Sequence, residues 1–238
     1  MKKRLRWVVP IVIITLPICV FLVYVGSYYH ADATAEAALV SDENVRVTQT
    51  EFGWLFDGPS DESALIFYPG GKVEATAYAP LCRRLAQTGA DVCLVEMPFR
   101  LAVFGKDKAD KIVDNMEYNN WYIGGHSLGG AIAAMYAAEH GDQLDGVVLL
   151  AAYATKPLEE RLPTVLIYGS EDGVLSMEKY RENIAHAPVQ ATEHVIEGGN
   201  HAQFGSYGNQ KGDGEALISP EQQVEETVTV ITETIFDQ

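Results

Sequence analysis

A serine flanked by glycines stands near the middle of the chain, in the segment Gly125-His126-Ser127-Leu128-Gly129. The segment directly follows a predicted strand and precedes an alanine-rich helical pattern. A strand that enters a helix through Gly-x-Ser-x-Gly is a nucleophile elbow, a tight turn that raises the serine hydroxyl above the end of a sheet. Glycines are needed there because a Cβ would strike the neighbouring strand or helix. The sequence therefore predicts Ser127 as a nucleophile rather than as a helix-capping serine.

A serine nucleophile needs a general base, and in elbow folds the chain order is serine, acid, histidine. Three histidines follow both Ser127 and the next predicted strand. His186 falls in a predicted helix and His194 in a predicted strand. His201 lies in Gly198-Gly199-Asn200-His201, a loop just after the last predicted strand, and it is the predicted base.

The acid should follow another strand at the same edge of the sheet. The predicted strand Thr164–Tyr168 runs into Gly169-Ser170-Glu171-Asp172-Gly173, which could also form an ordinary Asp-Gly turn. Asp172 is the preferred acid and Glu171 is the alternative. Asp172 would fix the tautomer of His201 and stabilise its imidazolium form.

Negative charge that develops on a substrate carbonyl oxygen needs two N–H donors. One donor should be the backbone N–H of Leu128, directly after the nucleophile. The second should come from the loop after the predicted strand Ala64–Tyr68, which reads Pro69-Gly70-Gly71-Lys72. Gly71 and Lys72 are the two candidates for this second donor.

The elements that must position these residues are short apolar runs that alternate with helical patterns. Continuous apolar runs are typical of strands buried on both faces, so the fold class is α/β, with a mostly parallel sheet and helices on both faces. A hairpin is predicted over Val45–Gln49 and Trp54–Phe56. Further strands are predicted over Ala64–Tyr68, Val92–Val95, Trp121–Gly124, Gly146–Leu150, Thr164–Tyr168 and Thr192–Ile196. Helices are predicted over Tyr78–Thr88 and Leu128–His140 and after Ser219-Pro220-Glu221-Gln222, which has the pattern of a capping box.

The combination of these motifs resembles the α/β-hydrolase superfamily and, more narrowly, the small bacterial α/β-hydrolase fold-5 family. The resemblance rests on the elbow, on the Gly-Gly loop after Tyr68, on Asp172-Gly173 and on Asn200-His201, and it covers roughly residues 45–236. It implies an eight-stranded hydrolase sheet, hydrolytic activity and triad roles for Ser127, Asp172 and His201. A related group that opens dienelactones uses cysteine at the elbow. This chain has Ser127 there, so the resemblance does not extend to that reaction.

The N-terminal segment differs in character from the rest of the chain. Residues 1–6 contain four basic residues, and the apolar stretch from Trp7 to Tyr29 that follows is long enough for a hydrocarbon core of ~30 Å. The next basic residue is Arg46, so the positive-inside rule places the N-terminus in the cytoplasm. Residues 1–30 are therefore predicted to form a single-pass membrane anchor, or alternatively a signal peptide cleaved near Ala31-Asp32-Ala33. Both interpretations place the catalytic domain outside the cytoplasm, tethered or secreted.

Charge and composition exclude several classes of partner. The 238 residues include 33 acidic and 17 basic residues, for a net charge of −16. Four of the basic residues lie in residues 1–30, so residues 31–238 carry 33 acidic and 13 basic residues, a net charge of −20. Nucleic acid is bound largely through Lys and Arg and is therefore excluded as a partner. The histidines are scattered, the cysteines lack ligand spacing and no glycine pattern suits a nucleotide, so no metal and no cofactor is predicted.

The remaining sequence divides into a polar linker, residues 31–44, and one hydrolase domain, residues 45–238. The segment 152–163, which lies between two predicted strands where a lid would be inserted, has only 12 residues, so the site should be open. Met97–Gly105 and Phe204–Ile218 are the segments expected to shape the pocket, although the second could equally be a surface spacer.

These features together predict a serine hydrolase that acts through a Ser-His-Asp triad and an acyl-enzyme. The predicted substrate is a small molecule with an acyl group, most simply a carboxylic ester. The alternatives are an acyltransferase that uses the same acyl-enzyme and a non-catalytic surface binding protein on a hydrolase fold. The sequence predicts neither the leaving group nor the oligomeric state.

Overall fold

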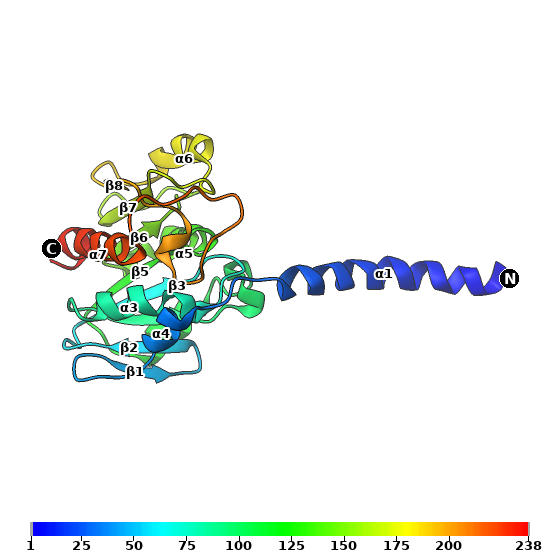
Figure 1. Cartoon of the computed structure of the whole chain (residues 1–238), viewed down its shortest axis with the longest axis horizontal. Coiled ribbons are helices and arrows are strands. Elements are labelled where there is room, and N and C mark those ends of the chain that lie inside the picture. Colours follow the sequence, from blue (N-terminus) through cyan, green and yellow to red (C-terminus); the bar gives the residue numbers. More distant parts are fainter. Residues whose placement is uncertain (1, 238) are drawn as a thin grey trace.

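The chain forms an α/β domain from which one long N-terminal helix projects (Figure 1). The structure, a computed structural model, describes residues 2–237, with side chains at residue 13 and from residue 15 onward. Helix α1 (Lys2–Gly26) extends away from the domain, and the C-terminus lies on the opposite side of the domain.

Within residues 2–237 the strands form one eight-stranded sheet in the order β1-β2-β4-β3-β5-β6-β7-β8. The β1–β2 and β2–β4 pairs are antiparallel and the others are parallel, so the predicted hairpin and the mostly parallel sheet are confirmed. Strand ends differ from the predictions by one or two residues at most. The strands are β1 (Arg46–Gln49), β2 (Gly53–Asp57), β3 (Ser63–Tyr68), β4 (Asp91–Val95), β5 (Asn120–His126), β6 (Gly146–Leu150), β7 (Thr164–Gly169) and β8 (Thr192–Ile196).

Helices cover both faces of this sheet, as predicted, and each face has its own apolar core. In β3, Leu65 and Phe67 belong to the core beneath α3 and α7, whereas Ala64 and Ile66 belong to the core beneath α4 and α5. This alternation follows from the pleat of a strand, which points successive side chains to opposite faces. The domain helices are α2 (Ala33–Ala37), α3 (Ala79–Ala86), α4 (Lys108–Asn115), α5 (Leu128–His140), α6 (Met177–Asn183) and α7 (Pro220–Ile231).

The predicted helix boundaries are confirmed where the sequence carried a specific signal. Helix α5 begins directly after Ser127 and ends at His140, as the glycine at each end indicated. Helix α7 begins with the predicted capping box, in which the Ser219 side chain accepts from the Gln222 N–H and the Gln222 side chain accepts from the Ser219 N–H. No helix or strand lies between β6 and β7 within the described chain, in agreement with the prediction that no lid is inserted there.

Residues 31–44, predicted as a linker, instead pack on the domain. They contain α2, whose Ala35 is fully buried. The guanidinium of Arg83 in α3 donates to the Ala38 carbonyl (2.9 Å) and to the Asp42 carboxylate (2.8 Å), and the Asp32 N–H donates to the Ser206 carbonyl (2.9 Å). The polar composition of this segment therefore reflects partners on the domain surface rather than a free spacer.

Helix α1 contains the residues predicted to form the membrane anchor. The side chains of residues 2–12 lie outside the described part of the chain. Among the residues that the structure describes, we find no helix whose length and apolar character suffice to cross a membrane.

Candidate active site

Ser127 occupies a sharp turn between the end of β5 and the start of α5. Its backbone has φ 53° and ψ −123°, a conformation that non-glycine residues rarely adopt and that costs about 1–3 kcal/mol. The Ser127 N–H donates to the Leu150 carbonyl at the end of β6 (2.8 Å), and its carbonyl accepts from the Ala131 N–H (3.0 Å). Neighbouring elements therefore hold the strained turn in place.

The glycines of this turn are required by close backbone contacts, as predicted. A Cβ on Gly125 would lie 2.4 Å from the Tyr68 carbonyl oxygen, and a Cβ on Gly129 would lie 2.2 Å from the Pro69 carbonyl oxygen. Both oxygens belong to the end of β3 or to the residue after it. The turn can approach β3 this closely only because both positions lack a side chain.

Asp172 and His201 meet at the same edge of the sheet, after β7 and β8. The His201 Nδ1–H donates to Asp172 Oδ2 over 2.8 Å, and each side chain is only 1% exposed. The other carboxylate oxygen of Asp172 accepts from the N–H groups of Val174 and Leu175, both at 2.8 Å. This pairing of Nδ1 leaves Nε2 as the proton acceptor of the ring, and Nε2 has no hydrogen-bond partner within residues 2–237.

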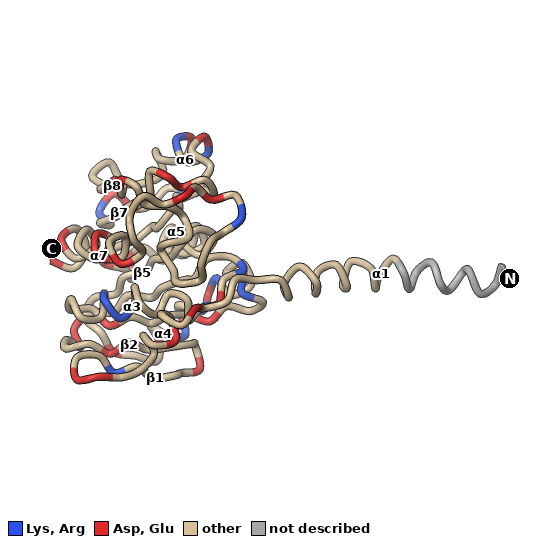
Figure 2. Tube along the Cα trace, in the orientation of Figure 1, with Lys and Arg blue, Asp and Glu red and all other residues tan. Residues whose placement is uncertain are grey.

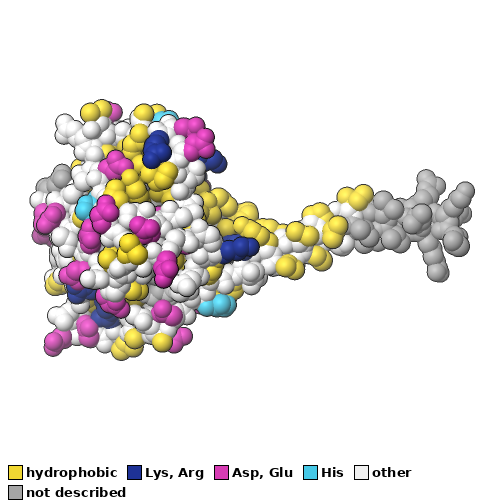
Figure 3. Space-filling view, turned by 45° about the horizontal axis from the view of Figure 1, so that its top comes forward, with side chains coloured by type: hydrophobic (Ala, Val, Ile, Leu, Met, Phe, Trp, Pro, Cys, Tyr) yellow, Lys and Arg dark blue, Asp and Glu magenta, His cyan; other side chains and the backbone are white. Residues whose placement is uncertain are grey.

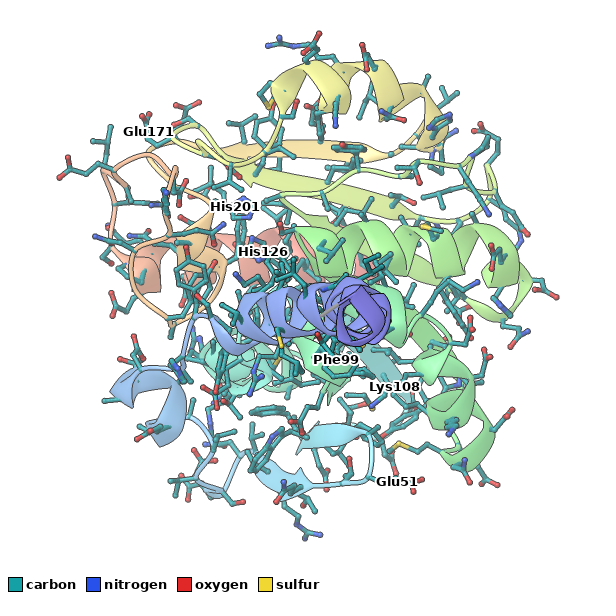
Figure 4. All side chains as sticks on the ribbon, turned by 90° about the vertical axis from the view of Figure 1, so that its right-hand side faces the viewer. Glu51, Phe99, Lys108, His126, Glu171 and His201 are labelled. Atoms are coloured by element: carbon teal, nitrogen blue, oxygen red, sulfur yellow. The ribbon has the colours of Figure 1, made fainter. Side chains whose placement is uncertain are left out.

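His201 lies beside the elbow. The centroid of its ring is 4.4 Å from that of His126, the residue directly before Ser127, and both histidines lie toward the end of the domain from which α1 projects (Figure 4). The structure thus brings Asp172 and His201 into contact and places His201 next to the elbow. The Ser127 hydroxyl makes no hydrogen bond within the described chain, which is common in ligand-free sites whose contacts tighten only with substrate.

The other residues weighed as base or acid lie elsewhere. His186 lies in a short 3₁₀ turn (Ile184–His186), where its Nδ1 contacts the Ala154 carbonyl oxygen at 3.1 Å. His194 lies in β8 and pairs with Glu226 in α7 at 2.7 Å. The carboxylate of Glu171, the alternative acid, accepts from the Ser170 hydroxyl at 3.1 Å.

Of the two candidates for the second oxyanion donor, only Gly71 retains a free N–H. The Lys72 N–H donates to the Arg100 carbonyl at 2.8 Å, whereas neither Gly71 nor Leu128 uses its N–H within residues 2–237. A Cβ built on Gly71 would lie 2.8 Å from Leu128 Cδ2, so the two residues are close neighbours. The start of α5 adds positive potential at this point, because its first N–H groups have no partner within the helix.

Asp213 is a residue of the site that the motifs did not reveal. Its carboxylate accepts from the N–H groups of His201 (3.2 Å) and Ala202 (2.8 Å), and also from that of Gly173 (3.1 Å), which follows Asp172. One carboxylate therefore joins the loop of the acid to the loop of the base. Its position between Gly212 and Gly214, within the segment of uncertain role after Phe204, was the available signal.

His126 and Tyr78 form a second buried pair that the sequence did not predict. The Tyr78 hydroxyl accepts from the Gly70 N–H (3.1 Å) and forms a hydrogen bond with His126 Nδ1 (2.7 Å). Burial holds the pKa of His126 well below its ordinary value, and the neighbouring His201 lowers it further. His126 therefore stays neutral and does not place a positive charge next to His201.

Comparison with known proteins gives a family match by sequence and several matches by structure. The model of the alpha/beta hydrolase family matches residues 64–225, more than half of the chain. No curated protein matches the chain by sequence.

Three solved structures illustrate the similarity of fold. A predicted CIB-like hydrolase from Thermoplasma acidophilum is 18% identical, with a TM-score of 0.57 over 80% of this chain and 100% of its own. Carboxylesterase CesB (YbfK) from Bacillus subtilis is 11% identical, with a TM-score of 0.56 over 85% of this chain and 96% of its own. A dienelactone hydrolase from Anabaena variabilis is 13% identical, with a TM-score of 0.55 over 81% of this chain and 100% of its own. At these identities the matches establish the fold alone.

Proposed function

Because the chain belongs to the alpha/beta hydrolase family, we propose that it is a serine hydrolase in which Ser127, His201 and Asp172 form the catalytic triad. The observation that carries this proposal is the buried pair of His201 and Asp172, joined at 2.8 Å beside a serine with φ 53°. A strained backbone and a buried histidine hydrogen-bonded to a buried carboxylate are together costly for stability alone, and they are typical of a catalytic site.

The proposed reaction begins with attack of the Ser127 hydroxyl on an acyl carbonyl. His201 Nε2 accepts the hydroxyl proton, and the Asp172 carboxylate stabilises the imidazolium that forms. The N–H groups of Leu128 and Gly71 bind the oxygen of the tetrahedral intermediate, a contribution whose loss typically costs about 10²–10³ in rate. His201 then protonates the leaving group. In the second half of the reaction, water attacks the acyl-enzyme while His201 accepts a proton from it, and His201 returns that proton to the Ser127 oxygen as the acid product leaves.

A carboxylic ester is the proposed substrate. The leaving alcohol of an ester needs one proton, which His201 supplies, and the site residues described above require no metal or cofactor for this step. The structurally similar protein from Bacillus subtilis is a carboxylesterase, which supports the same class.

The proposal is tested with a fluorophosphonate probe, which reacts covalently with activated serines. Wild-type protein should be labelled, and Ser127→Ala should abolish both labelling and hydrolysis of p-nitrophenyl acetate. Ser60→Ala, at a partly exposed loop serine, is the matched control and should be labelled like wild type. Continued labelling of Ser127→Ala would refute the assignment of the nucleophile.

The proposal extends to location. The basic residues before α1 and the absence of further Lys or Arg up to Arg46 support an N-terminal membrane anchor with the hydrolase domain outside the cytoplasm. The full chain should sediment with membranes and resist extraction by carbonate, and protease added outside intact cells should digest the domain. A soluble full-length protein in the cytoplasmic fraction would contradict this part of the proposal.

A further inference from the structure

The base of α1 and a loop at the catalytic edge form one apolar surface. Phe21 in α1 contacts the rings of Phe99 and Phe104, with centroid distances of 5.4 and 6.1 Å, and those two rings lie 5.6 Å apart. Phe99 and Phe104 are 49% and 53% exposed, and Val103 between them is 50% exposed. We call these four side chains the apolar collar; Figure 3 shows hydrophobic side chains gathered where α1 meets the domain.

Two basic side chains border the apolar collar and lie against tyrosines of the N-terminal segment. Lys72 Nζ is 4.3 Å from the ring centroid of Tyr24, and the guanidinium carbon of Arg100 is 3.4 Å from that of Tyr28. Figure 2 shows basic residues where α1 joins the domain. Aromatic and basic side chains next to an apolar surface are the arrangement found at the boundary between lipid and water.

The described part of α1 is apolar around its whole circumference. Its side chains are more than half exposed at several positions that face different directions: Ile13, Leu16, Ile18, Val20, Leu22, Val23 and Tyr24. A partner helix or a second protein would bury one stripe of such a helix, whereas lipid covers every side. Lipid is therefore the occupant that fits this surface best.

The apolar collar is connected through neighbouring residues to the loop that carries the proposed oxyanion donor. Lys72 directly follows Gly71, and the carbonyl of Arg100 holds the Lys72 N–H at 2.8 Å. Phe99 follows β4 and His126 ends β5, and these strands run parallel to β3, so both residues lie at the same edge of the sheet. Viewed along α1, Phe99, His126 and His201 lie around the helix (Figure 4). A lipid surface in contact with the apolar collar would face this edge of the sheet.

From this arrangement we propose that the apolar collar contacts the lipid surface and that the substrate is an amphiphilic carboxylic ester drawn from that surface. The statement about lipid contact stands on the surface itself, and the statement about the substrate rests on the proposed hydrolase function. A lipid-held ester would then approach this edge of the sheet from the lipid surface, without first dissolving in water.

Lipid contact is tested without catalysis. Full-length Phe99→Trp and, as a matched control, Val189→Trp are reconstituted in phosphatidylcholine vesicles with brominated acyl chains. Val189 is 89% exposed in the loop before β8 and is not part of the apolar collar. Bromine should quench the fluorescence of the new tryptophan at 99 and not that at 189, with the native tryptophans as a common background. Equal quenching in both proteins would overturn the proposal. A finding that residue 99 is buried between two copies of the chain would also overturn it.

The substrate class is tested with Phe99→Asn/Phe104→Asn, because asparagine tolerates the left-handed backbone of residue 99 (φ 56°). Rates are measured on a long-chain p-nitrophenyl ester held in vesicles and on soluble p-nitrophenyl acetate. The ratio of the two rates should fall about tenfold in this variant and stay unchanged in Val189→Asn. An unchanged ratio in the double variant would overturn the assignment of an amphiphilic substrate. If wild type hydrolyses neither ester while residue 99 is still quenched, the proposed function fails and lipid contact is upheld.

Discussion

The loops at the carboxyl edge of the sheet are held in two different ways. After β3 to β6, the turns contain non-glycine residues with positive φ: Lys72 (61°), Phe99 (56°), Arg100 (58°), Ser127 (53°) and Ala151 (47°). After β7 and β8, positive φ within the described residues is confined to glycines such as Gly198 (78°), and the carboxylates of Asp172 and Asp213 gather backbone N–H groups instead.

This difference indicates that Ser127, the proposed nucleophile, and His201, the proposed base, are held in place by different interactions. The strained backbone of Ser127 is held in place by close packing at the centre of the sheet. Such packing changes little with pH or salt. His201 is fixed by hydrogen bonds to carboxylates, which depend on charge and on the acceptor capacity of two oxygens. Activity should therefore be sensitive to single-atom changes in the carboxylates of Asp172 and Asp213, in the loops after β7 and β8. In the loops after β3 to β6, stability should instead be sensitive to substitutions that change the freedom of the backbone.

The largest expected effect on activity comes from a change at Asp172, the proposed acid. Asp172→Asn should lower kcat about 10⁴-fold, because the amide cannot stabilise the imidazolium and favours the wrong tautomer of His201. Steady-state hydrolysis of a soluble ester measures this change. Glu171→Gln is the matched control and should retain nearly full activity. Equal losses in both variants would show that the acid is misassigned.

A smaller loss is expected from Asp213. In Asp213→Asn one acceptor oxygen becomes an NH₂ group that opposes the N–H groups of His201 or Ala202, which displaces the His201 loop. A shift of about 1 Å in a catalytic group can cost about 10² in rate, so kcat should fall by that order while KM changes little. Asp142→Asn, on an exposed turn after α5, should leave kcat unchanged. A loss confined to KM would assign Asp213 to substrate binding instead.

An effect of pH on stability is expected from the buried neutral His126. Its folded-state pKa is depressed, so its contribution to stability is complete above the unfolded value of about 6.5 and is lost as the pH falls below that value. Below about pH 6.5, wild type should therefore lose up to about 1.4 kcal/mol per pH unit more than His126→Asn. Urea unfolding between about pH 7.5 and about pH 5 measures the difference. Parallel curves for the two proteins would contradict it.

The smallest expected effect is a gain in stability when backbone strain is relieved in the loops after β3 to β6. Ala151, with φ 47°, lies after β6, and Ala151→Gly should raise the free energy of unfolding by about 0.5–1 kcal/mol because glycine adopts this backbone without strain. Ala134→Gly, within helix α5, should have the opposite sign and cost about 1 kcal/mol. Thermal unfolding of both variants checks the pair. Destabilisation by Ala151→Gly would mean that packing of its methyl group outweighs the strain.

The local sequence was sufficient to predict features that depend on one element or one turn. The strands were recognisable because continuous apolar runs are buried between two layers, and the elbow because Gly125 and Gly129 have no room for a Cβ. The preference for Asp172 over Glu171 followed from its place before a glycine, and the structure places Asp172 rather than Glu171 against His201.

Features that depend on contacts between distant segments could not be predicted in this way. Asp213 acts through bonds to backbone N–H groups, which leave no pattern of residue types at the positions that donate. The choice between Gly71 and Lys72 depends on the Arg100 carbonyl in another loop. The packing of residues 31–44 likewise depends on Arg83, which is far away along the chain.

Tyr29 joins the end of α1 to the loop that carries Gly71. It forms a parallel bridge with Val73, in which the Tyr29 N–H donates to the Lys72 carbonyl (2.8 Å) and the Glu74 N–H donates to the Tyr29 carbonyl (2.9 Å). The helix and the loop therefore form one mechanical unit. A force that pulls α1 away from the domain is opposed by the ring contacts of Phe21, Tyr24 and Tyr28 and by these two hydrogen bonds. Through Lys72 such a force would also act on the backbone beside Gly71, the proposed oxyanion donor.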